Sequence, residues 1–263
     1  MQEQRIRSLG ELIDAVTPRE PDPVTGRRRD AGVYHGVSFA DRPLLTSLDR
    51  LGGVDPPHTK KHLEAHILRN FARYSRPHLP APISNDWELL VIAQHHGVPT
   101  RLLDWSYSPL VAAHFATANA VAGRDCAVWR LDWQVVHKAF GFQGLALLIQ
   151  DLMSAETFGA GHPVMPWDLF RGPERDFAAL IEPPSLNDRI VAQAAAFTIC
   201  SDTSQSFDAF LEKHDLGRAL TKLVIPAEAV RSVRDQLDMA GIEEKRLFPG
   251  LDGVAASIRR YYA

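Results

Sequence analysis

Hydrophobic residues recur at helical spacing in several parts of the chain. Leu63, Ile67, Phe71 and Tyr74 are three or four residues apart, which predicts a helix with one buried face. Asn85 and Glu88 stand three apart, as in a capping box, and Gly97 follows where a helix of residues 84–96 would end. The same reasoning predicts helices over residues 8–16, 58–74, 84–96, 108–122 and 227–240.

Short apolar runs bounded by glycine, proline or polar residues predict strands between these helices. They cover residues 33–37, 100–103, 127–133, 177–181, 189–200 and 223–226. In the fifth run, Gln193 falls on the same face as Val191, Ala195, Phe197 and Ile199, so we expect a glutamine in an apolar row. The mixture of scattered strands and helices predicts a single α+β domain with a modest sheet.

Composition excludes several classes of protein. The 263 residues are 45% hydrophobic and 23% charged, which is typical of a globular domain. A net charge of −3 argues against binding nucleic acid by bulk charge, although a local basic patch such as the run at residues 27–29 remains possible. Two unpatterned cysteines and a longest apolar run of six residues (144–149) indicate a cytoplasmic protein without a membrane span.

The most distinctive stretch is QHHGVPTRLLDW, residues 94–105. It resembles the signature of the FRG domain family, and the resemblance continues through residue 116 and into blocks at 181–197 and 241–253. Tyr34-His35-Gly36 stands where that family usually has an aromatic-Arg-Gly triplet, and His114 stands where a tyrosine is common. The resemblance implies one FRG-type domain over residues 1–263, with the first strand, helices and signature in 33–105 and the remaining strands in 106–263.

The order of these pieces also resembles the core of the ADP-ribosyltransferases. That resemblance implies a small split mixed sheet with a helical insertion after the first strand. It implies that His35 holds ribose hydroxyls of NAD, that Gly36 lets the backbone approach nicotinamide, and that Gln193 is the third catalytic position. Further NAD-binding residues would be Tyr34, Thr100, Arg101, Asp104 and Ser106.

The implied function is an ADP-ribosyltransferase-like enzyme with NAD as co-substrate. It would transfer ADP-ribose to a nucleic acid or protein, as a bacterial toxin or phage-defence effector, with an inhibitory partner protein in a toxin–antitoxin pair. Glutamine adds no negative charge to stabilise the ribosyl cation, so Glu174 or Glu182 is the alternative third residue.

The residues themselves leave other interpretations open. Gln193 and His35 are equally well explained as structural side chains, and Arg101 with Asp104 as a buried ion pair that fixes the signature loop. His95 and His96 would then cap a helix, or act as acid and base of a metal-independent ribonuclease with Arg101 as phosphate clamp. A non-catalytic module that binds a nucleotide or partner protein is the third hypothesis.

A metal site is not expected. Three histidines recur every four residues on a polar helical face that carries Arg69, but no carboxylate or thiolate joins them in the pattern: His58, His62 and His66.

Overall fold

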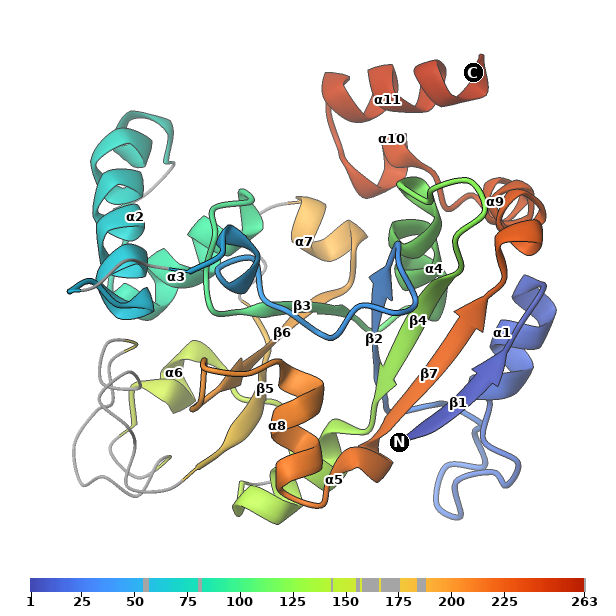
Figure 1. The fold of residues 1–263 in the computed structure, drawn as a ribbon, viewed down its shortest axis with the longest axis horizontal. Helices are drawn as coiled ribbons and strands as arrows, with labels where there is room; N and C mark the ends of the chain where they lie inside the picture. Colours follow the sequence, from blue (N-terminus) through green and yellow to red (C-terminus); the bar gives the residue numbers. More distant parts are fainter. Residues whose placement is uncertain are drawn as a thin grey trace.

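The computed structural model describes residues 1–53, 57–79, 82–142, 144–154, 157, 166, 176–183 and 188–262. The strands of this part of the chain form one mixed sheet in the order β1-β7-β4-β2-β3-β6-β5 (Figure 1). Their bounds are β1 Gln2–Arg5, β2 Val33–Val37, β3 Leu103–Ser106, β4 Cys126–Leu131, β5 Ala178–Ile181, β6 Ala195–Cys200 and β7 Leu220–Ile225. Among the strand pairs of the described residues, β1 and β7 are parallel and the other pairs are antiparallel. The α+β class and the mixed sheet are confirmed, but the strands form one sheet instead of the split sheet expected.

Two groups of helices cover opposite faces of the sheet. On one face lie α1 (Leu9–Val16), α4 (Pro109–Ala118) and α9 (Val230–Met239), which share an apolar cluster with β4 and β7. On the other lie α5 (Trp133–Phe140) and α8 (Phe207–Lys213), packed on Trp105, Trp129 and Leu220. Side chains of β4 and β7 contribute to both clusters, as expected for strands buried on both faces.

A third cluster covers the β6-β5 end of the sheet. It joins α2 (Lys60–Ser75), α3 (Asp86–His95) and α6 (Ile149–Leu152) to Phe197 and Ile199 of β6. The helices α2 and α3 lie between β2 and β3 in the chain, so the predicted insertion after the strand 33–37 is confirmed. The remaining elements are α7 (Asp188–Ala192), α10 (Glu244–Leu247), α11 (Leu251–Tyr261) and short 3-10 turns at η1 (Asp49–Leu51), η2 (Arg76–His78), η4 (Gly217–Ala219) and η5 (Ala227–Ala229).

Side-chain caps set where several helices begin. Ser8, Thr59, Asn85 and Ser108 each accept a hydrogen bond from a backbone N–H in the first turn. At the end of α3, Gly97 has φ +78°, a conformation that favours glycine, so the predicted stop is confirmed. None of the described helices is long and apolar enough to cross a membrane.

Four predicted features are wrong in position. The strand expected at 100–103 is β3, three residues later, and the first half of the run 189–200 is helix α7. Ala194 has φ +45° and separates α7 from β6, so Val191 and Gln193 do not share the strand face. Tyr74, expected in the buried stripe of α2, is 65% exposed. Strand β1 was not predicted, since all four of its residues are exposed and show no alternation.

Candidate functional site: a cleft at the junction of β2 and β3

The sheet is weakest at its centre, where β2 meets β3. These strands share one residue pair, Tyr34 with Ser106, whereas β2 and β4 share five. Beyond that pair the strands are joined by a side chain, since Nδ1 of His35 lies 2.6 Å from the carbonyl oxygen of Asp104. A cleft of about 1080 Å³ opens at this junction, which is large enough for a dinucleotide.

His35 lies half-buried in this cleft and is uncharged at neutral pH. Burial lowers its pKa to about 4 because the charged form is poorly solvated there; the Asp104 carbonyl opposes this shift and the Arg50 charge adds to it. A carbonyl oxygen only accepts, so Nδ1 of the neutral ring carries the proton. Nε2 is therefore a hydrogen-bond acceptor, which suits a ligand hydroxyl.

Asp104 presents a carboxylate to the cleft and is held by Gln94. The Gln94 amide donates from Nε2 to Oδ2 of Asp104 at 2.7 Å, while its Oε1 accepts from the hydroxyl of Thr100. The Asp104 side chain is open to the cleft, yet the surrounding protein desolvates it and raises its pKa, against the opposing effects of the Gln94 hydrogen bond and the charges of Arg50 and Arg189. A carboxylate with a raised pKa is suited to accepting a proton.

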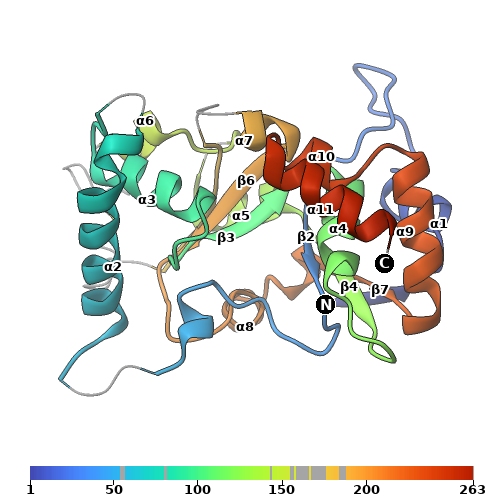
Figure 2. The ribbon, with the colours of Figure 1, turned by 90° about the horizontal axis from the view of Figure 1, so that it is seen from above.

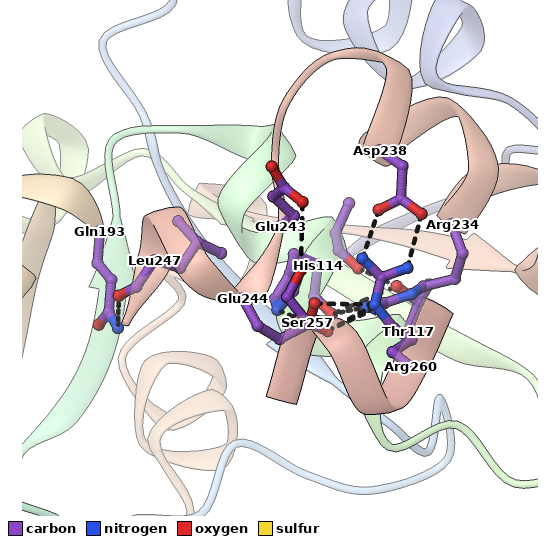
Figure 3. A network of polar contacts seen from close by, with 11 residues as sticks. His114, Thr117, Gln193, Arg234, Asp238, Glu243, Glu244, Leu247, Ser257 and Arg260 are labelled. Atoms are coloured by element: carbon purple, nitrogen blue, oxygen red, sulfur yellow. Dashed lines mark hydrogen bonds and ion pairs between the residues drawn. The ribbon is translucent and has the colours of Figure 1, made fainter. Parts of the chain in front are cut away.

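Gln193 also lines the cleft, although it lies in a turn and not on a strand. The Ser106 hydroxyl donates to the Gln193 carbonyl at 2.7 Å, which ties the turn to the end of β3. Its side-chain Nε2 donates to the carbonyl of Leu247 at 3.0 Å (Figure 3). Because this bond fixes the amide, Oε1 is the acceptor that the side chain has left for a ligand.

Three arginines from two separate segments line the same cleft: Arg42, Arg50 and Arg189. The guanidinium of Arg42 lies 3.9 Å from the centre of the Phe39 ring, and that of Arg189 lies 4.8 Å from the Phe248 ring. Arg50 donates to the carbonyl of Leu45 at 2.8 Å. This is a concentration of positive charge with aromatic surface beside it, and guanidinium groups bind phosphate oxygens in bidentate fashion.

Tyr34 and Gly36 line the cleft and also stabilise the fold around it. The Tyr34 hydroxyl donates to Asp30, which also pairs with Arg130. A Cβ on Gly36 would lie 2.0 Å from the carbonyl oxygen of Ala112 in α4. The glycine is therefore required by the close approach of strand and helix, in addition to the expected approach of a ligand.

Thr100 and Arg101 lie behind the cleft. Arg101 is 2% exposed, and its Nε and backbone N–H donate to the two carboxylate oxygens of Glu64 at 2.8 Å. The expected ion pair between Arg101 and Asp104 is wrong: Arg101 is buried, but its partner is Glu64 of α2. His95 lines the cleft, but the buried Arg101 does not. Arg101 therefore cannot bind a ligand phosphate there, as the ribonuclease hypothesis requires.

The alternative carboxylates do not reach the cleft in the described residues. Glu182 accepts a hydrogen bond from the Tyr107 hydroxyl at 2.5 Å and is absent from the cleft wall, and Glu174 lies outside the described residues. The carboxylates that line the cleft are Asp49 and Asp104, and Asp49 forms an ion pair with Lys60.

The C-terminal helices support the cleft from outside. Glu244 of α10 accepts from Arg234 and Arg260, and Arg260 also pairs with Asp238, which joins α9, α10 and α11 (Figure 3). These arginines hold the pKa of Glu244 at about 2, against the opposing effect of burial. The network holds α10 in position, and so holds the Leu247 carbonyl that orients Gln193.

Sequence reasoning missed the three cleft arginines. Arg42 lies in a loop, Arg50 lies in the turn η1, and Arg189 was assigned to a strand, so no local pattern marks them as a group. Only the folded topology brings them together.

Residues 30–124 match the model of the FRG domain. No curated protein and no solved structure matches the chain. The matched segment runs from β2 through α4 and includes His35, Gln94 and Asp104, whereas Arg189 and Gln193 lie beyond it. The match covers about a third of the chain and identifies an FRG domain over residues 30–124.

Proposed function

We propose that this protein is an ADP-ribosyltransferase-like enzyme that binds NAD in the cleft and transfers ADP-ribose to a macromolecular acceptor. The observation that carries the proposal is the convergence of a neutral histidine, a fixed glutamine and three arginines on one cleft of about 1080 Å³. No sequence window contains all of these groups, since they come from residues 35 to 193.

The cleft fits the charge and shape of NAD. The pyrophosphate carries two negative charges, which Arg50 and Arg189 would bind, and Phe39 and Phe115 in the cleft wall would contact the bases. The acceptor Nε2 of His35 would receive a ribose hydroxyl. We assign the NAD-binding role to these residues instead of Thr100 and Arg101, which are buried behind the cleft.

NAD supplies a glycosidic bond between ribose C1′ and the nicotinamide nitrogen, and the bonding electrons leave with neutral nicotinamide as an acceptor attacks C1′. Gln193 Oε1 would accept a hydrogen bond from a ribose hydroxyl and orient the ring. Asp104 would take the proton that the acceptor loses, since its raised pKa suits it to proton transfer. The acceptor is a nucleic acid or a protein, as expected of a toxin or defence effector.

The test is the release of nicotinamide from NAD by purified protein, alone and with RNA, DNA or cell lysate. His35→Ala and Gln193→Ala should each slow release by about 100-fold, the typical cost of losing one oriented hydrogen bond to a reacting group. Gln4→Ala is the matched control because this side chain is exposed on β1, outside the cleft. Release that persists in the cleft variants, or is absent from folded wild-type protein in every mixture, would overturn the proposal.

A further inference from the structure

Helix α2 and the turn η2 carry an unusual concentration of positive charge. Residues 57–79 hold five lysines and arginines and a single carboxylate, so this segment has a formal charge of +4 within a chain of −3. Both views place α2 at the outer edge of the molecule, beyond α3 (Figures 1 and 2). The remainder of the chain, at −7, does not share this character.

Arginines and histidines form one exposed stripe along the helix and the turn η2. Five of these side chains follow one another at spacings of three or four residues and are all exposed: His62, His66, Arg69, Arg73 and Arg76. Residues so spaced lie on one helical face. The single carboxylate, Glu64, points away from this face and is buried against Arg101. Within residues 57–79, therefore, no acidic side chain neutralises the positive charge of the stripe.

An exposed aromatic ring lies beside the stripe. Tyr74 is 65% exposed, and the guanidinium of Arg73 lies 5.2 Å from the centre of its ring. Aromatic rings interleaved with arginines are the usual platform for unpaired bases and the backbone that links them.

Aromatic contacts connect the stripe's helix to the cleft. The ring of Phe71 in α2 lies 6.4 Å from that of His96, and His96 lies 5.2 Å from His95. His95 lines the cleft, and His96 is exposed between it and α2. These contacts place α2 close to the cleft wall.

We propose that the outer face of α2 and η2 binds single-stranded nucleic acid through its phosphate backbone. A membrane surface fits less well, because the leucines and isoleucines of α2 are not among the exposed large hydrophobic residues and would not enter a bilayer. The binding itself does not depend on the proposed enzymatic function. That the bound nucleic acid is the acceptor of ADP-ribose rests on that function.

The binding test uses fluorescence anisotropy with labelled 20-nucleotide RNA and DNA, each single-stranded and as a duplex. Three phosphate contacts predict a slope of about −2 for the logarithm of affinity against that of salt, or about 20-fold weaker binding between 50 and 200 mM. Comparing RNA with DNA shows whether the protein prefers ribose or deoxyribose. Tighter binding of a duplex than of either single strand would contradict the proposal.

The locating test compares two triple charge reversals of equal size. Arg69→Glu, Arg73→Glu and Arg76→Glu should abolish most of the salt dependence, and Tyr74→Ala should weaken binding by about tenfold. The matched control reverses the exposed run at residues 27–29, in the loop after α1. The proposal would be overturned if both triple variants lost the same amount of nucleic-acid affinity, or if the α2 variant lost none. Nicotinamide release measured without acceptor should be unchanged in the α2 variant, which separates failure of this inference from failure of the proposed function.

Discussion

The Glu64–Arg101 pair offers a sharp test of how the cleft is supported. Glu64 is fully buried in α2, and Arg101 is buried immediately before β3, so the pair ties the peripheral helix to the sheet. We consider the substitution Glu64→Gln. The new amide oxygen can still accept from the Arg101 backbone N–H, as Oε1 of Glu64 does at 2.8 Å. The amide NH₂ replaces Oε2, so the hydrogen bonds from the Arg101 guanidinium are lost together with the negative charge.

The expected loss follows from the burial of Arg101. With 2% of its surface exposed, the guanidinium would keep its charge without a counter-ion, and removing one partner of a buried pair typically costs about 3–5 kcal/mol. Replacing both residues, by Glu64→Leu and Arg101→Met, leaves no buried charge. The double variant should therefore be more stable than Glu64→Gln, although it loses two hydrogen-bonding groups.

Urea unfolding, followed by tryptophan fluorescence, measures these free energies. The matched control is Asp41→Asn, which breaks the ion pair of Asp41 with Arg124, whose side chains are 67% and 51% exposed. That substitution should cost at most about 1 kcal/mol. The reasoning is refuted if Glu64→Gln is as mild as Asp41→Asn, or if the double variant is less stable than Glu64→Gln.

Three further predictions concern packing, pH and the C-terminal helices. Gly36→Ala should unfold at clearly lower urea concentration, because the new methyl group meets the Ala112 carbonyl at 2.0 Å; an unchanged midpoint would contradict this. Burial lowers the pKa values of His35, His95 and His114 to about 4 in the folded protein. In the unfolded chain a histidine has a pKa of about 6.5, so below that pH the unfolded chain binds more protons than the folded protein. The free energy of unfolding should therefore fall as pH is lowered from about 6.5 toward 4, and a flat profile in urea titrations across this window would be contrary evidence. Glu244→Gln should weaken the pairs with Arg234 and Arg260 and increase hydrogen exchange in α10 and α11, whereas unaltered exchange would mean that the network does not hold these helices.

Local signals in the sequence predicted much of the fold. The cap at Asn85 and the stop at Gly97 define α3 because both act within one turn of the helix. The predictions failed where contacts between residues far apart in the sequence determine the secondary structure. Strand β1 has no buried face and exists because it pairs with β7, more than 200 residues later.

The candidate site was predicted in part. His35, Asp104, Ser106 and Gln193 do meet at one junction, although the alternation that assigned Gln193 to a strand was wrong. Arg101 was expected to pair with Asp104, three residues away, but pairs with Glu64, 37 residues away. Adjacency in sequence favours the wrong partner here, since only tertiary packing brings α2 against the signature loop.

The most direct test of the central claim is calorimetric titration with ADP-ribose, which carries the pyrophosphate but lacks nicotinamide. Arg50→Ala and Arg189→Ala should each weaken binding by about tenfold or more, since a hydrogen bond to a charged group contributes about 1.5–3 kcal/mol. Arg231→Ala, at an exposed position on α9, is the control and should bind like wild type. Loss confined to the two cleft arginines is the predicted result. Equal affinity in all variants, or no binding to wild-type protein, would contradict a nucleotide site at the junction of β2 and β3.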